Sequence, residues 1–457
     1  MIERDEIEAK AAEFGLHWSN VQRDYVFGWL IGGLFEVSAL RGIVALKGGN
    51  ALRKGYFPAT RFSDDIDFTT TQGLDADSLL RELNDVCRFA EARSGVKFDL
   101  ERNQLVDTQL IERGKRIYKL RLYFRDFSGN ADHIALKVKV DVTEYDRILL
   151  PVQTRRLIHP YSDAAECSFD IRVVKLEEVL ADKMKCLIQR RYAYDLFDLV
   201  HGVFVNREFE VDRLELVQTF LRKTIFEPSP VAARDLLLGV PLDLLRGFWG
   251  KVVCPQATRL TFDSAVSLLR DGIATLFEPF SWGAHLAGLY FPAEFRNPIL
   301  QAGSDLTLLR VTYDGITRDV EPYSLVFKQA RDKPAREYFY GYDRSGGHTS
   351  GPGIKSLTLD GLQRVENTAT SFEPRYAVEL SKAGDSDNVG YFGQPFGTSR
   401  PRRSRARKTL VRSGPTYTVQ CPYCNKRFTR KRASTRLNKH TDGFGNQCYG
   451  RVGIRLF

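Results

Sequence analysis

The stretch VALKGGNALRKGYFPATRFSDDIDF, residues 44–68, places a paired glycine, a basic run and two aspartates close together. GIVALKGG predicts a strand that runs into a glycine turn, and ALRKGYF predicts a short helix after that turn. DDIDFTT predicts a second strand, in which Ile66 and Phe68 alternate with Asp65 and Asp67. A surface loop would explain this order of elements, and so would a site for phosphates and a metal ion.

The two aspartates of the second strand are candidate metal ligands. Because side chains alternate along a strand, Asp65 and Asp67 face the same side, about 6.5 to 7 Å apart at the backbone. Carboxylate oxygens are the ligands that Mg²⁺ prefers. Asp141, in KVKVDVT, would supply a third carboxylate from a neighbouring strand. We therefore predict a magnesium site, in which metal ions would clamp the oxygens of a phosphoryl group.

The glycine turn fits the same site. Gly48 and Gly49 precede the short helix, where backbone N–H groups and the helix dipole favour phosphate. Lys47, Arg53 and Arg61 could add positive charge. Taken alone, a glycine pair is most often a turn and D-x-D a solvated strand edge, but the combined order of strand, glycine pair, helix and D-x-D strand is far more specific.

This arrangement resembles the nucleotidyltransferase superfamily of the DNA polymerase β type. LKGGNAL and RFSDDIDF are similar to the AbiEii/AbiGii-type toxin nucleotidyltransferases, whose signature is K-G-G-T-x-L followed by R-x-S-x-D-I-D. Asn50 stands where Thr or Ser is usual in that family. The resemblance implies a set of nucleotide-binding residues: Lys47, Gly48, Gly49, Asn50, Arg61 and Ser63.

A later segment, LEEVLADKMKCLIQRRYAYDLFDL at residues 176–199, resembles a second motif of the same family, E-x-x-x-E-K-x-x-A-x-x-x-R-x-x-x-R-D-x-x-D. Lys183 matches the lysine of the motif, and Asp195 and Asp198 match its closing acids. Asp182 replaces the usual Glu, and Tyr194 stands where Arg is common.

The second motif also makes chemical sense by itself. In one continuous helix, Lys183, Arg190 and Asp198 would line a single face. Lys183 would neutralise triphosphate charge, and Asp198 would orient or deprotonate an acceptor hydroxyl. A solvated helix face with ion pairs is the alternative. We predict four catalytic residues: Asp65, Asp67, Lys183 and Asp198.

Residues 301–395 have short strands and turns typical of a small β-barrel or sandwich. RDVEPYSL, REYFYGYD and LQRVEN resemble a WYL domain, a small Sm/SH3-like barrel that binds nucleic acids or nucleotides. We expect Phe339 in the core, whereas the other aromatic residues could be core or contact residues. The candidate nucleic-acid contacts are Arg318, Tyr323, Tyr338, Tyr340 and Arg364.

The C-terminal segment is strongly basic. Residues 400–457 hold 16 of the 67 Lys and Arg residues and one of the 57 acids, so this segment has a charge of about +15 in a chain of net +10. Its spacing of cysteine and histidine predicts a Cys₃His zinc site made of Cys421, Cys424, His440 and Cys448. Arg430, Lys431 and Arg432 lie between these ligands and are candidate nucleic-acid contacts.

At 457 residues, with 43% hydrophobic and 12% aromatic content, the chain is expected to form several folded domains of α+β class. The predicted parts are a nucleotidyltransferase domain with a mixed sheet and helices (1–205), a helical accessory region (206–300), a WYL-like β-barrel (301–395), a basic linker (396–416) and a zinc-finger-like module (417–457). Residues 3–41 are expected to form two amphipathic helices.

The apolar run 25–35 is too short to cross a bilayer, and the charged N-terminus lacks the features of a signal peptide, so a cytoplasmic protein without membrane partners is expected. The resemblance implies a Mg²⁺-dependent transfer of NMP from an NTP, a toxin or antiphage-defence role and a cognate antitoxin. The basic tail favours RNA, with tRNA as one candidate, as the acceptor. The alternative is a nucleic-acid-binding regulator with a degenerate transferase core.

Overall fold

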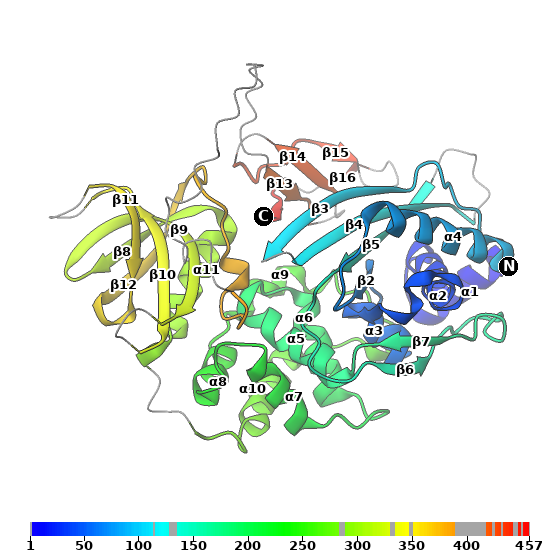
Figure 1. Cartoon of the computed structure of the whole chain (residues 1–457), viewed down its shortest axis with the longest axis horizontal. Helices are drawn as coiled ribbons and strands as arrows, with labels where there is room; N and C mark the ends of the chain where they lie inside the picture. The colour runs from blue at the N-terminus through cyan, green and yellow to red at the C-terminus, as the bar shows by residue number, and fades with distance from the viewer. Residues whose placement is uncertain are drawn as a thin grey trace. The chain divides into compact units, whose positions relative to one another are not determined.

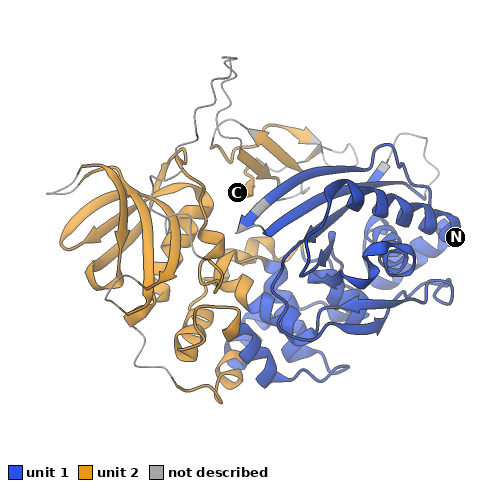
Figure 2. Cartoon of the chain, in the orientation of Figure 1, with its two compact units in different colours: residues 1–184, 193–220, 252–272 blue, residues 185–192, 221–251, 273–457 orange. Residues whose placement is uncertain are grey.

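The computed structural model describes residues 2–112, 115–127, 135–282, 288–329, 334–346, 351–388, 417–422, 426–430, 433–441, 447–448 and 451–456 (Figure 1). The chain divides into two compact units (Figure 2). Unit 1 comprises Met1–Met184, Ala193–Phe220 and Val252–Gly272, and unit 2 comprises Lys185–Tyr192, Leu221–Lys251 and Ile273–Phe457.

Unit 1 is built on a seven-stranded sheet with the strand order β3-β4-β5-β2-β1-β7-β6. Its strands are β1 Ala45–Lys47, β2 Asp65–Thr69, β3 Gln104–Glu112, β4 Lys115–Arg125, β5 Ala135–Thr143, β6 Gln153–Arg156 and β7 Asp170–Val173. Strand β2 runs antiparallel to β1 and parallel to β5, and β1 runs parallel to β7. The prediction of a mixed sheet with helices is therefore confirmed.

Helices α1 Arg4–Phe14, α2 Trp18–Val37 and α4 Ala76–Ser94 belong to the same unit (labelled in Figure 1; unit in blue in Figure 2). The expectation that α2 is amphipathic is wrong, because its residues are buried almost without interruption from Val21 to Phe35. Its glycines explain how other segments approach so closely. A Cβ atom on Gly28 would lie 2.2 Å from His159 Nδ1, and one on Gly32 would lie 2.2 Å from a ring carbon of Phe169.

The paired glycines are the first two residues of α3 Gly48–Ala51, which continues into a π-helical turn, Leu52–Tyr56. Two cations of this turn are buried against α2, where Asp24 Oδ1 accepts from Arg53 Nε at 2.6 Å and Asp24 Oδ2 from Lys54 Nζ at 2.8 Å. Tyr161 also donates to Asp24, at 2.9 Å. Arg53 therefore anchors the turn to α2. The expectation that it adds positive charge to the phosphate site is not met.

Unit 2 contains a five-stranded antiparallel sheet with the order β11-β10-β9-β8-β12. Its strands are β8 Thr307–Tyr313, β9 Ile316–Lys328, β10 Arg336–Asp343, β11 Gly353–Leu357 and β12 Leu362–Ser371. Both faces of the sheet are packed. Phe339 lies in the core that contains Ile299 and Leu300 of α11 Ala293–Asp305, as expected.

The second face buries all three aromatic residues proposed as nucleic-acid contacts. Tyr323 is fully buried, and Tyr338 and Tyr340 are 8% and 5% exposed, in a cluster that also holds Tyr417. Since these rings have almost no free surface, they are core residues here, and a base could not stack on them in this arrangement. Arg318 is paired with Asp343 at 2.7 Å, whereas Arg364 is exposed beside Glu366.

The C-terminal segment contributes a three-stranded sheet, β14-β13-β17, and a two-stranded pair, β15-β16. Their bounds are β13 Tyr417–Gln420, β14 Arg427–Arg430, β15 His440–Thr441, β16 Gln447–Cys448 and β17 Ile454–Leu456. The predicted linker 396–416, Cys424, Lys431 and Arg432 lie outside the described residues, and only the backbone of Arg430 is described.

The remaining helices are α5 Leu176–Gln189, α6 Ala193–Val200, α7 Arg213–Arg222, α8 Pro230–Leu238, α9 Arg246–Trp249 and α10 Phe262–Leu276. Among the described residues, no helix has the length and apolarity needed to cross a bilayer.

Candidate active site

Three carboxylates meet on one face of the unit 1 sheet. In the parallel pair of β2 and β5, Asp67 lies opposite Asp141 and Asp65 lies opposite Lys139, so the three acids share a side. Burial and the charges of Asp65 and Asp141 raise the pKa of Asp67 to about 7, and burial and Asp65 raise the pKa of Asp141. Asp141 Oδ1 is buried without a hydrogen-bond partner. A divalent cation would relieve this repulsion, so these residues fit Mg²⁺.

The glycine turn lies directly against the carboxylates. Gly48 has a positive φ of +70°, and a Cβ atom there would lie 2.3 Å from Asp67 Oδ2. A Cβ atom on Gly49 would lie 2.8 Å from Ser63 Oγ and 2.9 Å from Arg61 Nη2. Both positions need glycine, because only the absence of a side chain lets the turn approach Asp67 and Arg61.

We expect Gly48→Ala to lower nucleotide-transfer activity by at least about tenfold and to destabilise the protein by about 1–3 kcal/mol, since alanine would be strained at this φ and would displace Asp67. Initial rates and thermal unfolding would measure the two effects. Gly42→Ala is the matched control, because no atom lies within 4 Å of a Cβ atom built there. Equal activity of the two variants would contradict this role of the turn.

Lys47 lies opposite Asp67 in the β1–β2 pair, but its ammonium is held by a residue that the sequence analysis missed. Lys47 Nζ donates to Asp146 Oδ2 at 2.9 Å and to Thr143 Oγ1 at 3.0 Å. Asp146 also accepts from Thr69 Oγ1 at 2.7 Å. Burial alone would lower the pKa of Lys47, but Asp146 outweighs it and the pKa is raised. Asp146 belongs to no motif, so no signal in the sequence pointed to it.

The start of β2 is fixed by two of the predicted nucleotide-binding residues. Asn50 is fully buried, and its Nδ2 donates to the backbone carbonyl of Asp65 at 2.5 Å. Ser63 Oγ donates to Asp65 Oδ1 at 3.3 Å. Asp64 faces elsewhere and pairs with Arg23 at 3.2 Å. Asn50 and Ser63 therefore orient Asp65 in this structure.

The second motif forms a pair of helices and not one continuous helix, so the condition under which its residues would line a single face is not met. α5 ends at Gln189 and α6 begins at Ala193, and Arg191 between them has a positive φ of 56°. The helical phase that grouped Arg190 with the other two residues is lost at this elbow. Lys183 nevertheless meets the acids of α6, with Nζ 2.7 Å from Asp198 Oδ2 and 3.1 Å from Asp195 Oδ1.

Asp198 joins the second motif to the first. Its two carboxylate oxygens accept from Arg61 Nε at 2.6 Å and from Arg61 Nη2 at 2.7 Å, in addition to the contact with Lys183. Burial would raise the pKa of Asp198, but Arg61 and Lys183 outweigh it and lower the pKa. A carboxylate held by two cations is a poor proton acceptor. In this structure Asp198 holds Arg61 and Lys183 in place, and of the two expected roles, orienting or deprotonating a hydroxyl, its lowered pKa does not favour deprotonation.

Tyr194 stands where arginine is common in the family that the motif resembles. Its ring lies beside Arg61. The guanidinium of Arg61 lies 4.8 Å from the centre of the Tyr194 ring, a cation–π distance. Burial and the charge of Asp64 raise the pKa of Tyr194 to about 12, so its ring stays neutral. The guanidinium of Arg61 is thus held both by the carboxylate of Asp198, through two hydrogen bonds, and by the ring of Tyr194.

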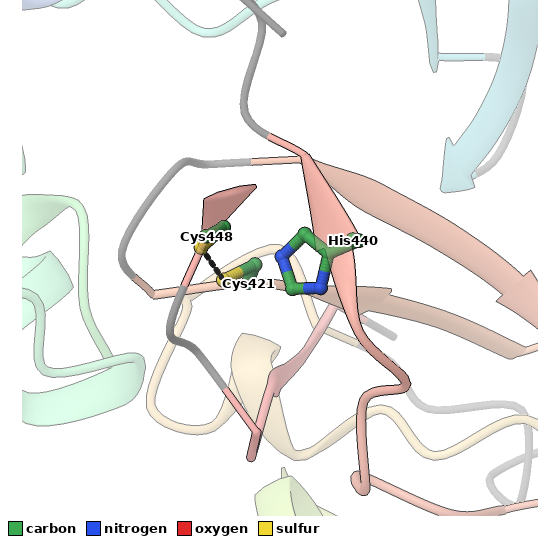
Figure 3. Close-up of side chains that lie close together, drawn as sticks. All are labelled: Cys421, His440 and Cys448. Carbon is green, nitrogen blue, oxygen red and sulfur yellow. Dashed lines mark hydrogen bonds between the residues drawn. The ribbon is translucent and has the colours of Figure 1, made fainter. Parts of the chain in front are cut away.

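A separate cluster in unit 2 could hold a metal ion. One ligand atom each from Cys421, His440 and Cys448 lies within 4.8 Å of the others, and the two sulfur atoms are 3.5 Å apart (Figure 3). His440 Nδ1 lies 2.8 Å from the carbonyl oxygen of Asn438, which only accepts, so Nδ1 carries the proton. His440 Nε2 is buried without a partner and keeps a lone pair for a metal. This donor set fits zinc, with Cys424 as the predicted fourth ligand.

We expect the purified protein to contain about one equivalent of zinc, and Cys448→Ser to reduce it to a small fraction, because a structural site needs all its thiolates. Mass spectrometry of metal content would measure this. Cys254→Ser is the control, since Cys254 is a buried free cysteine of unit 1. Zinc below about half an equivalent in the parent protein would contradict the site.

One family model matches the part of the chain that contains this sheet and both motifs. Residues 30–246 match the model of the family described as nucleotidyl transferase AbiEii toxin, type IV toxin–antitoxin system. The matched part of the chain includes every residue of the carboxylate site. No curated protein sequence matches the chain.

Two solved structures are similar at low identity. MenT4, a nucleotidyltransferase toxin from Mycobacterium tuberculosis, is 18% identical with a TM-score of 0.36, over 61% of this chain and 91% of that one. JHP933 from Helicobacter pylori is 15% identical with a TM-score of 0.34, over 57% of this chain and 93% of that one.

Proposed function

We propose that this protein transfers NMP from an NTP to an RNA hydroxyl in a Mg²⁺-dependent reaction that releases pyrophosphate. The observation that carries the proposal is the convergence of Asp65, Asp67 and Asp141 on one sheet face, against the glycine turn. These three residues would hold Mg²⁺, which would supply charge neutralisation for the phosphates and the leaving pyrophosphate.

The chain's own residues would orient the nucleotide. The N–H groups of Gly48 and Gly49 would donate to phosphate oxygens at the start of α3. Arg61 and Lys183, held in place by Asp198, would present positive charge to the triphosphate. Lys47, held by Asp146, would add charge beside Asp67.

We further propose that the protein acts as a toxin with a cognate antitoxin, as the description of the matched family suggests. The basic C-terminal segment supports RNA, with tRNA as one candidate, as the acceptor. We also propose that residues 301–395 form a WYL-like domain and that the protein has an antiphage role. In the proposed zinc-held module, residues 417–457, the residues that would bind RNA are Arg430, Lys431 and Arg432.

The test is incubation of the protein with Mg²⁺, bulk RNA and each of the four α-labelled NTPs in turn. Label in RNA with one NTP, lost on addition of EDTA and absent for Asp67→Asn, is the expected result. Label in protein alone would replace the RNA acceptor by a protein hydroxyl. If nothing is labelled and expression of Asp67→Asn is as toxic as the parent, the transferase proposal fails in favour of a nucleic-acid-binding regulator.

A further inference from the structure

The sheet face that carries the carboxylates continues across β5 and β4 as a basic surface. The opposite face of these strands is apolar and buried, and its residues are Tyr118, Leu120, Leu122, Phe124, Val138, Val140 and Val142. The alternate residues face the carboxylate side. There, Lys139 lies next to Asp65 on β2 and opposite Arg121 on β4. One residue pair further along, Lys137 lies opposite Tyr123.

On β4 and β5 this face is mostly basic, although Asp107 of β3 lies opposite Lys119 and Arg102 pairs with Asp99 at 3.8 Å. We name Arg102, Arg121, Tyr123, Lys137 and Lys139 the basic strip. Lys137 is exposed, and Arg121, Tyr123 and Lys139 are partly exposed. The guanidinium of Arg102 lies 4.6 Å from the centre of the Tyr123 ring. On the carboxylate side of β4 and β5, Asp141 is the only acid among the described residues.

Proximity to Asp141 accounts for only part of the strip. Arg121, Lys119 and Lys139 all act on the carboxylate of Asp141, and Arg121 Nη1 lies 3.6 Å from it. The pair of Lys137 and Tyr123, by contrast, lies two residues beyond the pair of Lys139 and Arg121, and so about 6.6 Å further from Asp141 along the strands. Cations next to an accessible aromatic ring, such as the partly exposed ring of Tyr123, are typical of surfaces that track a nucleic-acid backbone and stack a base.

We propose that the acceptor RNA approaches the carboxylates along the basic strip as a single-stranded end. Its phosphates meet Lys137 and Lys139, and a base stacks on the Tyr123 and Arg102 pair. Because Lys139 adjoins Asp65, a strand on this path ends at the carboxylates. This inference rests on the proposed function in one respect, namely that the acceptor is RNA.

The experiment measures binding of a labelled 12-nucleotide single-stranded RNA by the full chain, by fluorescence anisotropy at 50 and 200 mM salt. Tyr123→Ala is expected to weaken binding about tenfold, and Tyr123→Phe to restore most of it, because stacking needs the ring and not the hydroxyl. Lys137→Ala is expected to weaken binding several-fold and to reduce the slope of log K against log salt by about 0.7.

Arg88→Ala is the matched control, because Arg88 loses the same charge at an exposed position of α4. The Kd for Mg–NTP should stay unchanged in all four variants, and so should the melting temperature of Lys137→Ala. If the parent transfers NMP to RNA but Tyr123→Ala and Lys137→Ala bind RNA and use it as acceptor like the parent, the basic strip is not the path. If the parent labels no RNA yet binds the 12-mer through these residues, the proposed function fails and the binding surface stands.

Discussion

Asp67→Asn should lower the rate of nucleotide transfer by at least about 10²- to 10³-fold, the cost of losing one charged group that stabilises a transition state. Asp67 is central to the site, because it faces Asp141 on β5, Lys47 on β1 and the glycine turn. Initial rates at saturating Mg²⁺ would measure the loss. Asp64→Asn is the control, since Asp64 neighbours the site in sequence but pairs with Arg23 and should keep near-parent activity. Comparable loss in both variants would contradict the assignment.

The same substitution should stabilise the metal-free protein. Burial and two neighbouring acids raise the pKa of Asp67 to about 7 in the folded state, above its ordinary value of 3.8. The folded state therefore binds this proton more tightly, and stability falls as the pH rises from about 4 to 7. In EDTA at pH 8, Asp67→Asn should unfold at a higher temperature than the parent. Mg²⁺ should raise the melting temperature of the parent more than that of the variant, and the reverse order would exclude a metal site here.

Asp24→Asn should have the largest effect on stability, about 3–5 kcal/mol, because it leaves Arg53 and Lys54 buried without their anion. Arg53 is 1% and Lys54 0% exposed, so water cannot replace the lost carboxylate. Chemical denaturation would measure the change. Arg53 and Lys54 lie in the turn that follows α3, so activity should fall as well at temperatures where the variant is still folded.

Asp85→Asn is the control for this buried group, because Asp85 forms an exposed pair with Arg88 and should change stability by less than about 1 kcal/mol. The cations of the π-helical turn lower the pKa of Asp24 against the effect of burial. Its contribution to stability is therefore present above the ordinary pKa of 3.8 and is lost as the pH falls below it. An Asp24→Asn variant as stable as Asp85→Asn would show that the buried cations find other partners.

The local pattern of residues 44–68 predicted β1, the glycine turn and β2, because alternation and glycine content depend on neighbours in sequence. The later strand pattern KVKVDVT predicted that Asp141 would join Asp65 and Asp67, since strand alternation limits which acid can share a face with them. Asp24 and Asp146 gave no such signal. Their partners lie 29 and 99 residues away in sequence, so their roles arise only when the sheet and α2 pack.

The aromatic residues of β9 and β10 show a different limit. Alternation along β10 separates Phe339 from Tyr338 and Tyr340, and that separation is observed. Whether the second face meets water or protein depends on what covers it. Leu306, Phe372 and Tyr417 complete the second cluster from three distant parts of the chain, so tyrosines that could have met bases are core residues.

Insertions and deletions should have different effects in the elbow between α5 and α6 and inside α6 itself. Because residues 190–192 lie outside both helices, an added or removed residue there could be absorbed by the connecting segment. Within α6, a shift of one position would bring Phe197 or Leu199 to the place of Asp198, and Arg61 and Lys183 would face an apolar side chain. The spacing inside Tyr194–Asp198 is thus a strict constraint on the site, whereas the distance from Lys183 to that segment is a loose one.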